Sequence, residues 1–238
     1  MKSYYEEHCE NLRMIDQAIK TVQRTLRDYI SKDEETNIYI YTKILSHLIN
    51  TWAEVRILKL IYEIDAFSDI EKQKIIQTDS LNKRWEMALT IAFCKAYNIS
   101  NKKINNANYT QRMRYNALLD LISNDLLESY QLRNRIAHGQ WKYAFNNELL
   151  DINAELTKEL RKENIVKLQL KLRMFKSLAQ IIHDLAVSTP TFERDFDTNY
   201  RKIEEQKRNF HNRSYEDYKQ KMIEKRRRGL LKRKINNN

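Results

Sequence analysis

The sequence contains very few of the residues that make tight turns. Its 238 residues include only two glycines, Gly139 and Gly229, and one proline, Pro190. Hairpins that need positive backbone φ angles are therefore nearly excluded. The runs of Leu, Ile, Lys, Glu and Gln that fill the chain are typical of helices instead. We therefore predict an all-α protein, a bundle of long antiparallel helices.

The chain is also poor in cysteine and in long apolar runs. Its two cysteines, Cys9 and Cys94, are too few for a disulfide framework or a cysteine-based zinc site. The first residues lack the apolar core of a signal peptide, and no run of about 18 apolar residues occurs. A Gly-rich phosphate loop, a Cys/His cluster and a nucleophile elbow are missing from the sequence as well. We therefore expect a cytoplasmic protein that uses no metal or cofactor and has no membrane partner.

Negative charge is scarce at the C-terminal end. The formal net charge is +11, and residues 201–238 carry 14 Lys and Arg against 5 Asp and Glu, a net +9. Residues 1–200 are thus left with a net charge of only +2. This asymmetry predicts a polyanionic partner, and nucleic acid is a better candidate than a membrane.

Apolar periodicity and the breakers between periodic stretches predict six helical segments. They cover roughly residues 4–29, 36–63, 69–76, 79–97, 109–137 and 153–187, with an Asn/Lys-rich loop at residues 98–108. Gly139 stops the helix before it, and Thr189-Pro190 ends the last one. We expect residues 1–188 to form the bundle. Residues 189–238 are expected to form a basic helical extension that is partly disordered at its end.

The most informative short pattern lies where the helix predicted for residues 109–137 ends. Arg133 and Asn134 are followed by His138, which directly precedes Gly139. Arg is a permanent cation suited to phosphate, and His transfers protons near neutral pH. A structural explanation stays open beside this one, because cations at a helix C-terminus interact favourably with the helix dipole. The other histidines lack ligand spacing and are predicted to be structural or surface residues: His8, His47, His183 and His211.

Arg133-Asn134-x-x-x-His138 resembles the defining motif of the HEPN superfamily, in which Arg and a polar residue, often Asn, precede a His on a late helix of an α-bundle. The stretch Arg133–Trp141 is similar to members found in toxin–antitoxin and phage-defence loci. The resemblance implies a metal-independent endoribonuclease with RNA products that end in a 2′,3′-cyclic phosphate. In it, His138 would be a general acid or base, Arg133 would bind the scissile phosphate and Asn134 would orient Arg or phosphate.

The spacing of the motif raises a geometric problem within one chain. Residues five positions apart on a regular helix point about 140° away from each other. Arg133 and His138 converge only if the helix end distorts near Gly139, or if a two-fold dimer brings two motifs face to face. HEPN proteins usually dimerise, so we expect a homodimer. An antitoxin or regulatory protein is a further candidate partner.

Three neighbours of the motif are candidate supporting residues. Glu54, in the helix predicted for residues 36–63, either pins Arg133 through a bidentate pair or lies on a solvated helix face, and we favour the solvated face. Trp141 either stacks on a base or anchors the loop after the motif on the bundle, and we favour the anchor. Gln140 lies between the motif and Trp141.

The basic extension offers a second way to contact RNA. Its candidate RNA-binding residues are Lys225, Arg226, Arg227, Arg228, Lys232 and Arg233. The aromatic residues interleaved upstream, which suit base stacking, are Tyr200, Phe210, Tyr215 and Tyr218. A solvated tail explains the same composition equally well. A lipid surface fits less well, because large apolar side chains are few.

Because the apolar helices are predicted to end before Pro190, we expect truncation after Tyr200 to leave the bundle folded. Two alternatives to an enzyme remain at this stage. One is a non-catalytic RNA-binding helical protein, and the other is a helical adaptor that binds another protein.

Overall fold

The structure, a computed structural model, describes residues 3–236 and is helical throughout most of that range. In chain order the elements are α1 (Tyr4–Lys32), α2 (Glu35–Ile61), α3 (Asp69–Ile76), α4 (Leu81–Ala96), the 3-10 turn η1 (Asn101–Asn106), α5 (Tyr109–Leu121), the π-helical turn η2 (Ile122–Leu126), α6 (Leu127–Ala137), α7 (Ala154–Lys162), α8 (Ile165–Val187), α9 (Thr189–Asn212) and α10 (Tyr215–Asn236). Residues 3–236 contain no sheet, only one isolated bridge between Phe145 and Ile152. The predicted all-α class is confirmed.

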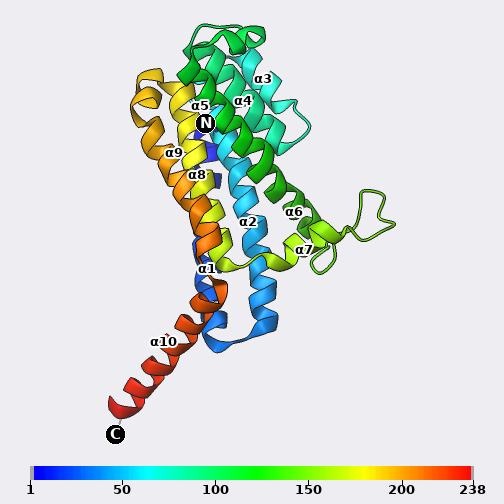
Figure 1. The fold of residues 1–238 in the computed structure, drawn as a ribbon, viewed down its shortest axis with the longest axis vertical. Helices are drawn as coiled ribbons and strands as arrows, with labels where there is room; N and C mark the ends of the chain where they lie inside the picture. The colour runs from blue at the N-terminus through cyan, green and yellow to red at the C-terminus, as the bar shows by residue number, and fades with distance from the viewer. Residues whose placement is uncertain (1–2, 237–238) are drawn as a thin grey trace.

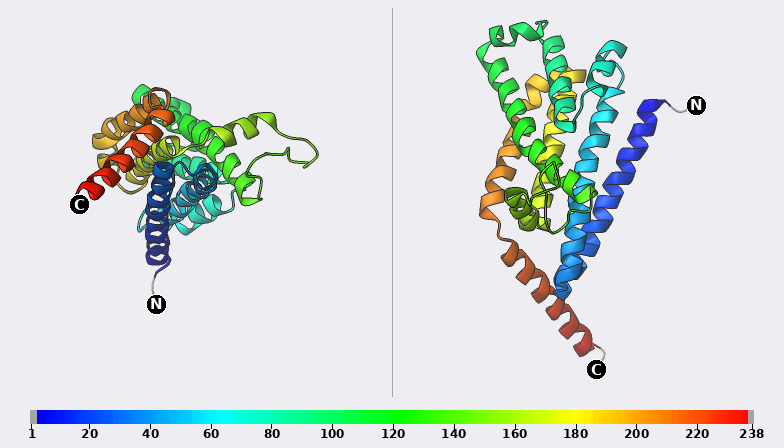
Figure 2. Two further views of the ribbon diagram at one scale, coloured as in Figure 1. Left: turned by 90° about the horizontal axis from the view of Figure 1, so that it is seen from below. Right: turned by 90° about the vertical axis from the view of Figure 1, so that its right-hand side faces the viewer.

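The helices pack lengthwise around α2 and α8 (Figure 1). Both carry buried residues along most of their length, because the chain covers them from several sides. α1 lies antiparallel to α2, and Asp33, with a φ of 60°, makes the tight reversal between them (Figure 2). Within the described range, no helix is long and apolar enough to cross a membrane.

The helix predicted for residues 109–137 contains an interruption that apolar periodicity did not reveal. The backbone widens to a π-helical turn at Ile122–Leu126 before it resumes as α6. The Ser123 hydroxyl donates to Glu86 of α4 at 3.1 Å, and Asn124 donates to Asp120 at 2.6 Å. A π turn changes the phase of the residues that follow it, so it sets the direction in which the motif residues of α6 point.

The single helix predicted for residues 153–187 is wrong, because the chain breaks at Glu163 and Asn164. Glu163 is extended, with φ −63° and ψ 136°, and the Asn164 side chain accepts a hydrogen bond from the Lys167 amide to cap α8. Glu163 is held by α2, where the Ser46 hydroxyl donates to it at 2.8 Å and the buried Lys43 ammonium lies 3.6 Å away. The tertiary pairing of this carboxylate fixes the break.

The expected boundary between residues 188 and 189 does not separate two units. The Ser188 hydroxyl caps α9, Pro190 fits in its first turn, and α9 then runs back along α8 (Figure 1). Phe192, Phe196 and Ile203 of α9 are buried in the same core as α2 and α8. Residues 189–212 therefore belong to the bundle. Pro190, which was predicted to end a helix, also starts the next one.

α10 is half docked and half projecting. Tyr215, Tyr218 and Met222 pack against the core, and Lys219 pairs with Asp33 at 2.6 Å and with Glu35 at the α1–α2 turn. Beyond these residues the helix leaves the bundle at the end where α1 and α2 join (Figures 1 and 2). The aromatic residues that we assigned to base stacking from the sequence, including Tyr200 and Phe210, are partly buried packing residues.

Candidate active site at the end of α6

α6 ends in a Schellman cap built on one of the two glycines. Gly139 has a φ of +77°, a conformation that a residue with a Cβ rarely adopts. The Gln140 amide donates to the Arg135 carbonyl at 2.9 Å, and the Gly139 amide donates to the Ile136 carbonyl at 3.1 Å. His138 is the C-cap residue and is exposed. The predicted stop at Gly139 is confirmed, and it presents the imidazole at the last turn of the helix.

Arg133 points from α6 toward α2. Its Nη2 donates to the Glu54 carboxylate at 2.8 Å, and its Nη1 donates to the Asn134 side-chain oxygen at 3.2 Å. The two charged side chains are 23 % and 26 % exposed, so the ion pair stays open to solvent on one side. Burial raises the pKa of the Glu54 carboxyl, although the positive charges of Arg133 and then Arg84 act in the opposite direction. The solvated face that we favoured for Glu54 is wrong, and its contact with Arg133 goes through one carboxylate oxygen.

His138 lies on another side of α6, in the wall of a groove of about 840 Å³. Gln131, Asn134, Arg135 and His138 share this wall, which matches one face of a helix at spacings of three and four residues. In the described part of the chain, Arg133 and His138 share no hydrogen bond. The regular end of α6 therefore leaves the predicted geometric problem in place. Asn134 links the two sides, because it accepts a hydrogen bond from Arg133 and also lines the groove.

His47, which we did not single out as a site residue from the sequence, lies close to the motif. It precedes Glu54 by two turns of α2, so both fall on the same face of that helix. Burial, and then the nearby positive charge of Arg133, lower the pKa of His47. Both effects favour the neutral imidazole, so His47 is a further candidate for proton transfer near the guanidinium. The sequence signal that could have identified His47 is its spacing of seven residues from Glu54, which places both residues on one face of a helix.

Gln140 and Trp141 hold the segment after the motif in place. The Gln140 side chain accepts from the Phe145 amide at 2.8 Å. The Trp141 indole donates to the Ile136 carbonyl at 3.0 Å, and its own carbonyl accepts from the Tyr39 hydroxyl of α2. Trp141 packs on a small core of α6 and α7. The predicted anchoring role of Trp141 is confirmed, and Gln140 has a similar one.

The predicted RNA-binding residues of α10 are all exposed but are not equivalent. Arg226 pairs with Asp28 of α1 at 3.3 Å. The cations with no ion pair within the described residues are Lys225, Arg227, Arg228, Lys232 and Arg233. They lie on the projecting half of α10 and are not brought together with Arg133 and His138 (Figure 1).

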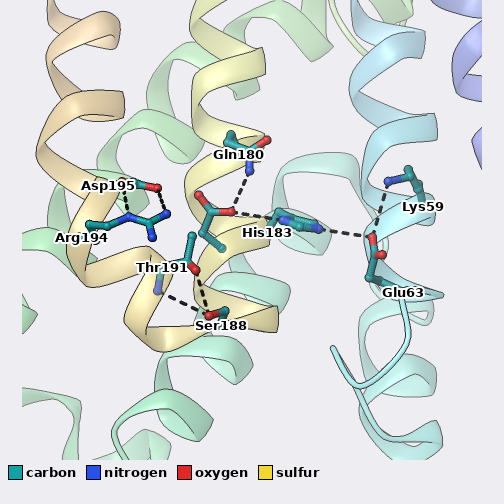
Figure 3. Close-up of polar contacts among 9 residues, drawn as sticks. Lys59, Glu63, Gln180, His183, Ser188, Thr191, Arg194 and Asp195 are labelled. Atoms are coloured by element: carbon teal, nitrogen blue, oxygen red, sulfur yellow. Dashed lines mark hydrogen bonds and ion pairs between the residues drawn. The ribbon is translucent and has the colours of Figure 1, made fainter.

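A further polar cluster fastens the end of α2 and the turn that follows it to α8 (Figure 3). His183 of α8 lies between two carboxylates, with Nε2 3.3 Å from Glu63 and Nδ1 3.3 Å from Asp184. Glu63 also contacts Lys59 at 3.5 Å, and Asp184 accepts from Gln180 at 2.7 Å. Because these groups satisfy one another across two core helices, we assign the cluster to packing, as predicted for His183.

The pairing of Glu54 with Arg133 makes a testable prediction. Glu54→Gln keeps the shape of the side chain and removes its charge, so the guanidinium loses its fixed orientation. We expect RNA cleavage to fall about tenfold, because one charge-assisted hydrogen bond is weakened, while the melting temperature changes little. Asp16→Asn, which removes a surface ion pair with Lys176, is the matched control. Equal activity of the two variants would show that Glu54 does not position Arg133.

Comparison of the chain with protein-family models, with curated proteins and with solved structures gave no match. The case for a function therefore rests on the residues at the end of α6 and on the charge that α10 carries.

Proposed function

We propose that this protein is a metal-independent endoribonuclease of the HEPN type, with its active site at the C-terminal end of α6. The observation that carries the proposal is the exposed His138 at a capped helix end, one turn beyond Asn134. On another side of the same helix, the Arg133 guanidinium donates to Asn134 and to Glu54 of α2. A proton-transfer group, an amide and a phosphate-binding cation thus occupy two successive turns of a single helix.

The proposed reaction needs only these groups and the RNA itself. His138 takes the proton of a ribose 2′-hydroxyl, and the resulting oxygen attacks the adjacent phosphorus. The bond from phosphorus to the 5′-oxygen breaks, this oxygen receives a proton, and a 2′,3′-cyclic phosphate remains. Arg133 stabilises the charge that develops on the phosphoryl oxygens. The second proton-transfer group comes from the partner in a dimer, whose motif supplies another His138.

The charge of the groove indicates that it does not attract RNA by itself. Its lining contains Glu128, Glu155 and Glu159 against Arg135 and the imidazole. Lys171 pairs with Glu128 and Lys162 pairs with Glu159, so the lining carries little free charge of either sign. Long-range attraction of a polyanion must therefore come from another part of the surface. The exposed cations of α10 are the strongest source, which separates long-range attraction from the chemistry at α6.

A homodimer is the second expected property. The hairpin-shaped loop after α6 projects from the bundle, and Leu149, Leu150 and Ile152 on it are exposed by 63 %, 80 % and 54 % (Figure 1). Burial of these side chains against a second copy would stabilise a dimer beside the motif. We expect light scattering at micromolar concentration to give about twice the chain mass of 28.8 kDa.

Leu150→Asp should shift this dimer to monomers and reduce cleavage in parallel, because the charge would be buried in the interface. Ile70→Asp, at an exposed position on α3, is the control and should leave the mass and the activity unchanged. A wild-type protein that cleaves RNA as a strict monomer would contradict the dimeric site.

The direct test of the proposal is cleavage of single-stranded RNA by the purified protein in EDTA. In the cell, such an activity suits a toxin or an abortive-infection effector under the control of an antitoxin or another regulatory protein. The alternative of a non-catalytic RNA-binding protein is supported by the unpaired cations of α10. It predicts binding without cleavage, and a protein-interaction adaptor predicts neither.

A further inference from the structure

A second, more basic cavity lies where α9 gives way to α10. It has a volume of about 350 Å³ and is bounded by α8 on one side and by residues 212–221 on the other. Three cations line it, each from a different element: Arg173 of α8, Arg213 of the joint and Lys221 of α10. Asp217 is the one carboxylate in the lining. The sequence pattern did not identify this site, because Arg173 lies forty residues before the joint.

These three cations are free to bind an anion. All three side chains are exposed, and in the part of the chain that the structure describes none of them has an ion pair. The joint itself is ordered, because the Asp217 amide donates to the Ser214 hydroxyl at 3.2 Å and the Arg213 amide donates to the Asn209 carbonyl at 3.0 Å. Tyr218, in the wall of the same cavity, packs on the core and fixes the direction in which α10 leaves.

The cavity continues into a line of positive charge on α10. Lys221, Lys225, Arg228 and Lys232 are spaced by four, three and four residues, so they share one face of the helix. At 1.5 Å per residue the line is about 16 Å long. The cations that α10 uses for docking lie on another face, where Lys219 binds the α1–α2 turn and Arg226 binds Asp28.

We propose that the cavity at the α9–α10 joint and this line of cations form one binding track for the sugar–phosphate backbone of single-stranded RNA. The proposal rests on the proposed ribonuclease function and names the surface that captures its substrate. A linear array of unpaired cations is complementary to a linear polyanion. A compact anion would use only the three cations of the cavity, and Leu230, Leu231 and Ile235 at the far end are the side chains that a lipid surface would need.

The test measures binding of a fluorescent single-stranded oligoribonucleotide with 2′-O-methyl groups, which cannot be cleaved through a 2′-hydroxyl. The track variant is Arg173→Ala/Arg213→Ala/Lys221→Ala. The control variant, Lys83→Ala/Lys102→Ala/Lys103→Ala, removes the same charge from exposed positions on α4 and η1. We expect the track variant to bind on the order of 10²-fold more weakly, roughly fivefold for each exposed cation that no longer pairs with a phosphate. Its salt dependence should flatten by about 2 in slope, and the control should be weakened much less.

Equal weakening of the two variants would overturn the track, because the net charge alone would then explain binding. Wild-type protein that binds vesicles of phosphatidylcholine and phosphatidylserine but not the oligonucleotide would also overturn it. The active site is tested separately, by cleavage of unmodified RNA over a range of RNA concentrations. The track variant should need a higher RNA concentration than the wild type for half-maximal cleavage, and an inactive wild type would contradict the ribonuclease proposal alone.

Discussion

His138→Ala should reduce RNA cleavage by about 10²–10⁴-fold, the usual contribution of a general acid or base. The stability of the protein should hardly change, because His138 is exposed and the cap of α6 depends on backbone hydrogen bonds to Gly139 and Gln140. Initial cleavage rates and thermal melting of the same preparation measure both quantities. His211→Ala, at another exposed histidine, is the matched control.

Full activity of His138→Ala would show that the proton-transfer residue does not lie at the end of α6. His47 would then be the first alternative, since it lies near Arg133, and burial and that positive charge lower its pKa and so favour the neutral imidazole. His47→Ala therefore belongs in the same series, and we expect its effect to be the smaller of the two.

Truncation after Tyr200 is expected to unfold the bundle or to lower its melting temperature sharply. The cut removes Ile203, which is 1 % exposed, together with Phe210, Tyr215 and Tyr218 from the packed side of α9 and α10. Removal of one such buried aliphatic side chain costs about 2–5 kcal/mol, and the truncation removes several. The sequence had predicted a folded bundle after this truncation. The structure reverses that expectation, because α9 packs along α8 and contributes to the core.

Two milder variants keep this prediction testable if the truncated chain does not fold at all. Ile203→Ala should lower the melting temperature by about 5–20 °C. This range combines the free energy lost when a buried side chain leaves a cavity with the usual change in melting temperature per kcal/mol for a chain of this size. Truncation after Glu224 removes the projecting part of α10 and one exposed ion pair, Arg226–Asp28, and should leave the melting temperature within a few degrees of wild type. A stable protein that ends at Tyr200 would contradict the packing of α9 and α10.

The fold class was predictable because two glycines and one proline leave few places where helices can stop. The break between the first two helices, the short helix at Asp69–Ile76 and the stop at Gly139 are confirmed, although the first helix ends at Lys32 and not at residue 29. The break at Glu163 was not predictable, because it depends on Ser46 and Lys43, which lie more than a hundred residues earlier.

The end of the bundle was misjudged for a related reason. Pro190 disfavours the helical region for the residue before it, yet it also suits the first turn of a new helix. The charged composition of residues 189–212 conceals a narrow apolar stripe, Phe192, Phe196 and Ile203, that is visible as a core face only once α8 is there to receive it.

The candidate site was predictable in its members and not in its arrangement. Arg133, Asn134 and His138 stood out by residue type and spacing, and Glu54 was named as a candidate partner. The direction of each side chain depends on the π turn at Ile122–Leu126 and on the distance to α2, which no local pattern contains. Glu155 and Glu159, two of the carboxylates that line the groove, come from α7. The hairpin-shaped loop between α6 and α7 brings them to the same groove as His138.

The most direct measurement is the chemical structure of the RNA ends that the purified protein makes in EDTA. Mass spectrometry of the products should show 2′,3′-cyclic phosphates from wild-type protein, and a single 2′-deoxy substitution on the 5′ side of the cleaved bond should abolish cleavage there. Products with 3′-hydroxyl and 5′-phosphate ends, or cleavage that survives the 2′-deoxy substitution, would contradict a reaction through the 2′-oxygen and with it the role given to His138.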